Sequence, residues 1–407
     1  MKFLPHQRMI LAAFLLDFAV ASGLVATPFL AFALLKAGPG LTGTLGAMQM
    51  ALYAVGCLSS AYFFRGTQPG LWWSIGGVSG FALLYALLPL ASAPILFGVV
   101  ATAPFLALAL AWPAMQAWVG SERNLSLRAR YLSWFNTATA FGFTVSPLII
   151  GPLFDYDMRA PFVGLALMGG ITVMLLLSLP RSPVKEDPTF DTSRKHTNEQ
   201  SIRLDSGLLY ASWFATSVAN GLVTSVRAIY PKRIESLVES RELTLIASYR
   251  PAGLDAVGAA TSFSWLTFLL SFSTVICFLL LGRTTSWQHR FRWIVCGQIS
   301  AAGALLLLAT AKSIGLLIFC FAIQGANYGI SFFASLYYSL YVPEKSHRRA
   351  AINEGALGAG GFLGGVGVGF LAEHIGVERA FLLAPVPVLM ALLVQIWLLK
   401  RFRSTKA

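Results

Sequence analysis

The sequence has 407 residues, of which 56% are hydrophobic and only 12% are charged, about half the charged share of an ordinary soluble domain. This composition excludes a typical soluble enzyme. The net charge of +13 would suit a nucleic-acid-binding protein, but the basic residues fall between long apolar stretches, so no nucleic-acid partner is expected.

Apolar stretches recur along the whole chain, and about 20 apolar residues at 1.5 Å per residue are enough to cross a bilayer. The first half contains six of them, near residues 9–35, 41–64, 71–90, 94–119, 131–154 and 160–179. A charged stretch with Pro183 and Pro188 follows, and prolines interrupt helices. Six more apolar stretches lie near residues 207–230, 256–282, 293–311, 314–341, 350–372 and 380–400. We therefore predict an all-α integral membrane protein with one six-helix unit at 1–180, a linker at 181–206 and a second unit at 207–407.

The distribution of Lys and Arg predicts the orientation in the membrane. Of the 30 basic residues, 21 lie in segments on the same side as the N-terminus and nine lie on the other side. Because basic residues accumulate in cytoplasmic loops, both termini and the linker are expected in the cytoplasm and the protein in the plasma (inner) membrane. The same basic loops are expected to contact anionic lipid headgroups of the bilayer.

Cysteine and histidine give no sign of a metal site or a catalytic centre. The four cysteines lie inside apolar stretches without C-x-x-C spacing. The five histidines fall in predicted loops or tails, without metal-ligand or catalytic spacing; they are His6, His196, His289, His347 and His374. We expect no metal, no cofactor and no enzymatic activity.

Two internal echoes suggest that the two units are repeats. Residues 21–25 (ASGLV) in the first span match residues 219–223 (ANGLV) in the seventh. The fifth span begins at Arg130 and passes two glycines before Asp155, and the eleventh begins at Arg348 and passes two glycines before Glu373. Both echoes fall where a six-plus-six duplication places them.

These features together resemble the major facilitator superfamily, over essentially the whole chain. Residues 62–68 (YFFRGTQ) are similar to the family's motif between spans two and three, with Arg65, and residues 282–292 to the equivalent loop with Arg283. Residues 142–152 (GFTVSPLIIGP) resemble the pattern of the family's antiporters. The resemblance implies two pseudo-symmetric six-helix bundles that alternate access to a cavity lined by spans one, four, seven and ten.

Asp17 is the only acidic residue well inside a predicted span. An ionised carboxylate there costs about 2.5 to 3.5 kcal/mol on insertion scales, so such residues face a cavity or a partner. One interpretation is that Asp17 carries the coupling proton. The other is a structural ion pair with Arg123 or Arg130 near the ends of spans four and five.

Polar and aromatic side chains form stripes on several spans, and polar groups in hydrocarbon turn inward. Inward-facing groups serve either as helix-to-helix contacts or as a substrate surface. We predict substrate contact for a set on spans two, four, seven, eight and ten, namely Gln49, Tyr53, Trp112, Gln116, Trp213, Asn220, Trp265, Gln324, Asn327 and Tyr328.

Four further features of the second half bear on the mechanism. Arg227, near the expected helix end at Pro231, either snorkels to the headgroups or binds an anion. Because phosphate esters and dicarboxylates normally need paired cations, such substrates are disfavoured. Glu354 is expected to be structural, stabilised by a helix N-terminus and by Arg348 or Arg349. The glycine-rich span eleven should permit close helix approach.

The sequence thus predicts a secondary active transporter of a small organic solute, by proton-coupled antiport out of the cell. Proton-linked uptake of a neutral solute such as a sugar or nucleoside, or a transport-inactive receptor or scaffold on the same fold, are the alternatives. A monomer is expected, and the substrate is not specified by the sequence.

Overall fold

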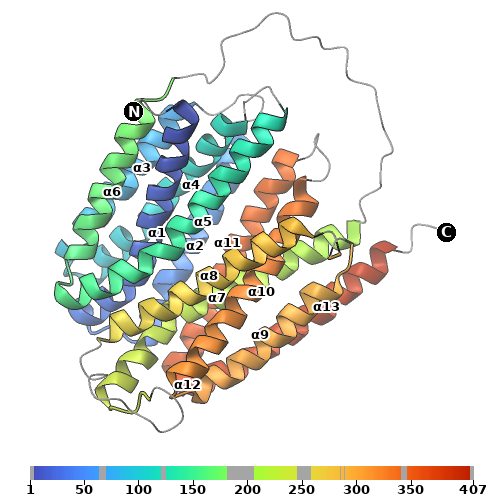
Figure 1. Ribbon diagram of the computed structural model, residues 1–407. Coiled ribbons are helices and arrows are strands. Elements are labelled where there is room, and N and C mark those ends of the chain that lie inside the picture. The colour runs from blue at the N-terminus through green and yellow to red at the C-terminus, as the bar shows by residue number, and fades with distance from the viewer. Residues whose placement is uncertain are drawn as a thin grey trace, which may run out of the picture.

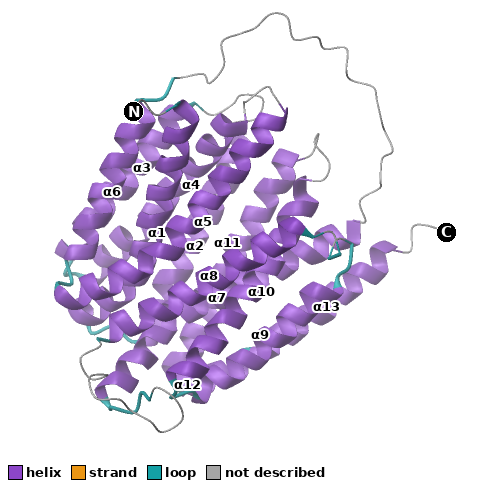
Figure 2. Ribbon diagram, in the orientation of Figure 1, coloured by secondary structure: helices purple, strands orange, loops and turns teal. Residues whose placement is uncertain are grey.

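A computed structural model describes residues 4–63, 70–120, 125–180, 206–244, 258–284, 286–287, 289–340 and 346–403. These residues are almost entirely helical (Figures 1 and 2). Within the described ranges no strand occurs, and only an isolated bridge joins Thr244 to Ser313. The predicted all-α fold class is confirmed.

The helices follow the predicted spans closely. The N-terminal bundle contains α1 (Pro5–Leu35), α2 (Pro39–Phe63), α3 (Leu71–Leu87) with the short helix η1 (Leu88–Leu90), α4 (Pro94–Gly120), α5 (Leu125–Tyr156) and α6 (Ala160–Leu177). The C-terminal bundle contains α7 (Ser206–Glu239), α8 (Ala259–Arg283), α9 (Arg292–Thr310), α10 (Ile314–Leu340), α11 (Ser346–Ile375), α12 (Val377–Leu383) and α13 (Pro385–Arg403).

Eleven of the described helical segments are long and apolar enough to cross a membrane, with α12 and α13 together forming one of them. The helix outside this set is α7, whose polar stripe lowers its mean hydropathy. It is also longer than its predicted span, because the helix continues through Pro231 to Glu239. Ile234 and Leu237 on this extension are fully buried, so packing of its apolar face stabilises the helix beyond the proline.

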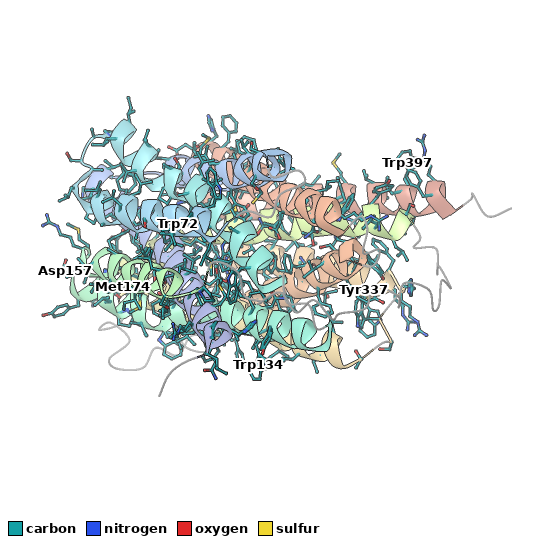
Figure 3. All side chains as sticks on the ribbon, turned by 90° about the horizontal axis from the view of Figure 1, so that it is seen from above. Trp72, Trp134, Asp157, Met174, Tyr337 and Trp397 are labelled. Carbon is teal, nitrogen blue, oxygen red and sulfur yellow. The ribbon has the colours of Figure 1, made fainter. Side chains whose placement is uncertain are left out.

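The outer surface of the bundles is strongly apolar. Trp134 is 56% exposed and Trp397 is 52% exposed, and both lie at the rim of the molecule seen from above (Figure 3). An aqueous surface rarely presents so many large apolar side chains, whereas a bilayer accommodates them. The chain is therefore an integral membrane protein.

We name the two ends of the bundles by the chain. The linker side holds the start of α1, the end of α6 and the start of α7, and the far side holds the opposite helix ends. The predicted linker itself lies outside the described residues, apart from Ser206 at the start of α7. In Figure 1 the two bundles diverge toward the linker side and converge toward the far side.

Helix α11 is packed between α2 of the other bundle and α7 of its own. A Cβ atom added at Gly358 would meet Ala54 of α2, and one at Gly365 would meet Ala47. On the neighbouring face, a Cβ at Gly360 would overlap the carbonyl oxygen of Ser217 in α7. The glycines thus permit the close helix approach that the sequence predicts, because small residues let backbones come together in a membrane.

Polar side chains join helices within each bundle. Ser22 of α1 and Ser146 of α5 share a hydrogen bond of 2.9 Å. In the C-terminal bundle, Gln298 of α9 and Gln395 of α13 exchange two hydrogen bonds of 3.3 and 3.1 Å, and both side chains are fully buried. Such contacts contribute about 0.6 kcal/mol each on average in membrane proteins, and they fix which helix faces meet.

Candidate functional site

A cluster of ionisable side chains is formed by helices of both bundles. It comprises Asp17 of α1, Tyr53 of α2, Arg227 of α7, Tyr328 of α10 and Glu354 of α11, and we call it the central polar cluster. The Tyr53 hydroxyl donates a hydrogen bond of 3.4 Å to Glu354 Oε2, joining the bundles. Asp17 and Glu354 both lie in the surroundings of the two tyrosines. The two bundles therefore share one charged centre.

Asp17 lies twelve residues into α1, about 18 Å along the helix axis. Among the described residues its carboxylate has no hydrogen-bond or ion-pair partner. Of the two arginines predicted as structural partners, Arg123 lies outside the described residues, and only the backbone of Arg130 is described. An unpaired carboxylate at this depth is costly when ionised, and proton uptake removes that cost.

A cavity lies beside this cluster, between α1 and α2 of one bundle and α7 of the other. Its volume of about 50 Å³ is several times the space that one water molecule needs. The lining combines apolar and polar side chains: Leu24, Thr27, Pro28, Thr42, Leu45, Gly46, Gln49, Met50, Asn220, Thr224, Arg227 and Ala228. Such an apolar wall with a few convergent polar groups is typical of a small-molecule site.

Arg227 is the only positively charged residue of the cavity lining. Its guanidinium stacks over the Phe143 ring of α5, 4.6 Å from the ring centroid, and Nη2 donates to Ser271 Oγ of α8 at 3.3 Å. No carboxylate in the described part of the chain forms an ion pair with it. The side chain therefore points into the interface between the bundles and does not reach for the headgroups.

Two of the predicted substrate residues line the cavity. Gln49 Nε2 donates to the Ala101 carbonyl oxygen at 3.0 Å. Asn220 Nδ2 donates to the Leu357 carbonyl oxygen at 2.9 Å. These bonds hold both amides in the cavity wall, on opposite bundles. Tyr53 and Tyr328, also predicted, belong to the central polar cluster.

Two further predicted amides, Gln324 and Asn327, lie away from the cavity, between α9 and α10. Gln324 Nε2 donates to the Ala301 carbonyl oxygen at 2.9 Å. Asn327 is buried, and its side chain lies 3.3 Å from a Cβ placed at Gly297. Both amides therefore face a neighbouring helix of their own bundle.

The predicted aromatic contacts are dispersed. Trp213 donates from Nε1 to Ser339 Oγ at 2.8 Å, within the C-terminal bundle. Trp112 packs edge-on against Phe135. Trp265 is 53% exposed, outside the cavity lining.

The side chain of Gln116 is not described. The same holds for most of the predicted gating residues. Arg65 lies outside the described residues, and for Arg283 of α8 only the backbone is described. Arg349 is described, and its enclosed Nη1 has no hydrogen-bond partner among the described residues. The partner of Glu354 is the Tyr53 hydroxyl.

The far side is joined by two carboxylates that cross between the bundles. Asp155 at the end of α5 accepts hydrogen bonds from the Thr261 backbone N–H and hydroxyl at the start of α8, at 2.9 and 2.6 Å. Glu373 near the end of α11 accepts one from the Gly40 N–H at the start of α2, at 2.8 Å. Each carboxylate thus faces a helix N-terminus, where the helix dipole favours negative charge.

These two contacts are related by the internal repeat. In the internal repeat, α5 of the first unit corresponds to α11 of the second, and α2 corresponds to α8. The contact between α5 and α8 and the contact between α11 and α2 therefore join corresponding helices. The sequence placed Asp155 and Glu373 at corresponding positions but did not reveal their role. The sequence signal for these contacts was a glycine beside each helix N-terminus that the carboxylate faces. A Cβ atom at Gly258 would contact Asp155, and one at Gly38 would contact Glu373.

Aromatic rings lie beside these contacts. Phe29 of α1 meets Phe154 of α5 and Phe263 of α8, with ring centroids 5.8 and 5.9 Å apart. Phe263 meets Phe321 of α10 at 6.1 Å. These packed rings continue the far-side contact between the bundles.

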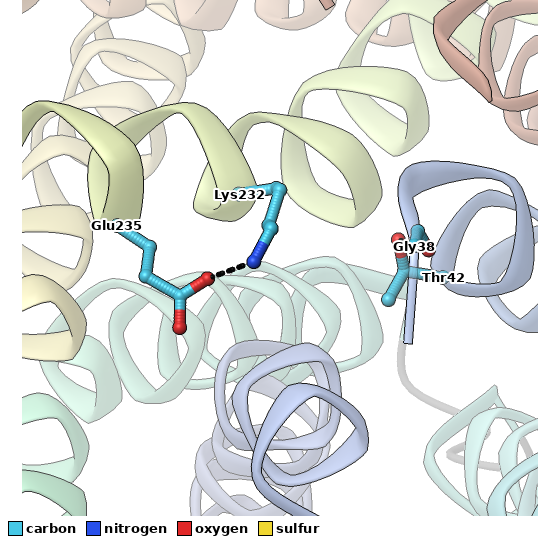
Figure 4. A network of polar contacts seen from close by, with 4 residues as sticks. All are labelled: Gly38, Thr42, Lys232 and Glu235. Carbon is cyan, nitrogen blue, oxygen red and sulfur yellow. Dashed lines mark hydrogen bonds and ion pairs between the residues drawn. The ribbon is translucent and has the colours of Figure 1, made fainter. Parts of the chain in front are cut away.

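The start of α2 and the extension of α7 approach each other nearby. Lys232 on that extension pairs with Glu235 at 2.6 Å, opposite Gly38 and Thr42 (Figure 4). The Lys232 ammonium also lies 5.2 Å from the centre of the Phe32 ring of α1. The far side is thus held by polar, aromatic and cation–π contacts across the bundle interface.

No protein-family model and no curated protein matches the sequence. Solved structures match along the whole length of the chain. The nucleoside transporter NupG matches with a TM-score of 0.73 and 14% identity, over 98% of this chain and 100% of that chain. A bacterial homologue of the human lysosomal transporter Spinster, in an inward-facing and occupied conformation, matches with a TM-score of 0.72 and 12% identity, over 100% of both chains.

The unoccupied inward-facing form of the Spinster homologue matches with a TM-score of 0.70 and 14% identity, over 99% of this chain and 98% of that one. At such identities the similarity establishes the fold. These structures are of transporters, and they share the two-bundle architecture that the sequence resembles. The chain is therefore an integral membrane protein with the major facilitator fold.

Proposed function

We propose that the protein is a secondary active transporter that moves a small organic solute by alternating access. The observation that carries the proposal is the charged centre shared by the two bundles, with a cavity beside it and interlocked helix ends on the far side. A site of this kind is reached from one membrane surface when the bundles are joined at the other. The units that rock would be residues 1–180 and 207–407, connected by the linker at 181–206.

We assign the far side to the outside of the plasma (inner) membrane, because the excess of Lys and Arg predicts cytoplasmic termini and a cytoplasmic linker. The conformation is then inward-facing. A single chain contains both bundles and the whole cavity, which supports a monomer as the working unit.

Proton coupling is assigned to Asp17. Its carboxylate lies in a membrane-spanning helix without a described partner, so its charge is compatible with the apolar surroundings only when water, a cation or a proton compensates it. Glu354 adds a second carboxylate to the central polar cluster, held by Tyr53 of the opposite bundle. A proton bound here would change the charge at the interface that must open and close.

Export by proton antiport is the proposed direction. It is supported by residues 142–152 of α5, which resemble the antiporter pattern and form part of an unbroken helix. Proton-linked uptake of a neutral solute is the second candidate, and the fold similarity to a nucleoside transporter favours including nucleosides among the solutes tested.

Reconstitution into vesicles tests the proposal. Solute flux and internal pH are followed together for a broad panel of organic solutes, with the Asp17→Asn variant beside the parent chain. We expect Asp17→Asn to abolish concentrative, proton-driven transport and to retain counterflow exchange, because the variant still binds solute but carries no proton.

The matched control is Asp157→Asn, an exposed carboxylate between α5 and α6 that lies at the rim of the molecule (Figure 3). Its Oδ1 accepts a hydrogen bond from the Arg159 N–H, which asparagine can also accept. Unchanged pH dependence in Asp17→Asn would reject Asp17 as the proton carrier. Absence of flux for every solute would instead support a receptor or scaffold on this fold.

A further inference from the structure

Arg227 forms no ion pair with any carboxylate of the described structure, and this is the feature from which we infer the chemistry of the solute. It lies in the interior of α7, between Phe143 of the other bundle and Ser271 of its own bundle. Charged side chains at such positions are retained when they pair with another charge, a ligand or a water-filled path. The three described ion pairs do not include Arg227.

The cavity provides the polar surroundings for such a ligand. Arg227 lines it together with Gln49, Asn220 and Thr224, so one cation is surrounded by neutral hydrogen-bonding groups. A guanidinium carries five N–H donors, and one of them is used in the contact with Ser271. Its remaining donors can bind both oxygens of a carboxylate in the bidentate geometry that arginine favours.

The balance of charges between the ligand and the cavity limits the ligand to one negative charge. The central polar cluster already contains Asp17 and Glu354, and Arg227 is its single cation. A phosphate ester or a dicarboxylate would bring more negative charge than one guanidinium neutralises. We propose that the transported solute carries one carboxylate group and that Arg227 binds this group in the cavity. This inference rests on the proposed transport function and specifies its substrate class.

The arrangement also assigns the two charge compensations to different species. A bound carboxylate compensates Arg227 of α7, and a proton compensates Asp17 of α1. Glu354 of α11 keeps its hydrogen bond from Tyr53 in either case. Recognition of the solute and binding of the proton are therefore separable, and variants at the two positions should have different effects.

Thermal unfolding of the purified full-length protein tests this inference. The probes are benzoate, nicotinate, lactate and octanoate, each compared with its own neutral amide at the same concentration. A ligand that binds the folded state raises the melting temperature as its concentration increases. We expect stabilisation by one or more of the carboxylates and none by the matching amides.

Arg227→Gln should weaken the apparent affinity for the active carboxylate about 10- to 100-fold, the range for a lost charge-assisted hydrogen-bonding group. Arg227→Lys should retain part of the affinity, because the charge remains and the fork geometry is lost. Arg292→Gln, an exposed arginine at the start of α9, is the matched control and should bind like the parent chain.

Stabilisation by amides as strong as that by the carboxylates would overturn the inference, as would carboxylate binding that persists in a folded Arg227→Gln protein. Failure of all four carboxylates to stabilise the parent chain would also overturn it. The outcome is independent of proton coupling, because Asp17→Asn should still bind the carboxylate. Unchanged pH dependence of flux in Asp17→Asn, together with retained carboxylate binding, would reject the coupling proposal and leave this one standing.

Discussion

Removing the two far-side carboxylate charges should shift the protein toward the conformation in which the far side is open. The perturbation is the double variant Asp155→Asn/Glu373→Gln, which keeps the side-chain size and removes both charges. Asp155 accepts two hydrogen bonds across the interface and Glu373 accepts one. Both carboxylates are exposed, so the range for solvent-accessible charges at a helix N-terminus applies, about 0.3 to 1 kcal/mol each.

The two sites are at different helix pairs and share no partner, so their effects should add. Together they stabilise the far-side contact by about 0.6 to 2 kcal/mol, which corresponds to a population shift of roughly 3- to 30-fold. Each single variant should produce about half of the free-energy change. High salt should reduce the difference between the variants and the parent chain, because both groups are exposed.

The assay is a distance distribution between two spin labels on the far side, one in each bundle. Cysteines replacing the exposed Tyr156 and Ser240, in a background without the four native cysteines, provide the attachment points. We expect the double variant to populate longer distances. An unchanged distribution, or one that Asp157→Asn reproduces, would refute the assignment of these carboxylates as far-side contacts.

Two further predictions concern packing within the membrane. Gly360→Ala should lower the melting temperature in detergent, because the added methyl group overlaps the Ser217 carbonyl oxygen; the expected loss of stability is about 1 to 3 kcal/mol. The control is Gly367→Ala, where nothing lies within 4 Å of the added Cβ, and it should leave the melting temperature unchanged or raise it. Equal effects of the two would contradict the packing. Gln298→Leu should destabilise the protein by about 1 to 3 kcal/mol by leaving Gln395 without its partner, and adding Gln395→Leu should restore most of that loss. If the double variant is no more stable than the single one, the pair is not coupled.

The helical architecture was predictable because the bilayer imposes one simple requirement. A helix must present about 20 apolar residues, and the predicted spans differ from the helices mainly at their ends. The largest difference is in α7, which continues through Pro231. Its extension is stabilised by tertiary contacts such as the buried Ile234, and local sequence rules that end a helix near proline do not include such contacts.

The candidate site was only partly predictable. Of the residues predicted to contact the substrate, Gln49 and Asn220 line the cavity, whereas Gln324 and Asn327 face α9. The sequence shows that a polar group turns inward, but two inward directions exist, toward a neighbouring helix and toward the other bundle. Choosing between them requires the rotation of each helix about its axis.

The contacts of the charged residues could likewise be predicted only in part from the sequence. Both interpretations of Arg227 were compatible with its sequence position, and its contacts with Phe143 and Ser271 favour the interior. Glu354 was expected beside arginines, and its hydrogen bond to Tyr53 comes from a residue 301 positions away in the chain. Pairings at such separations depend on how the bundles meet, which no local pattern contains.

The glycine-lined contacts of α11 have a consequence for biogenesis. Each glycine lowers intrinsic helix stability by up to about 1 kcal/mol relative to alanine, and seven occur between residues 358 and 369. This segment therefore depends on its neighbours for a defined position more than the other spans do. Both neighbours, α2 and α7, precede it in the order of synthesis. Insertion of α11 between two helices that already exist would make the joining of the bundles one of the last steps of assembly.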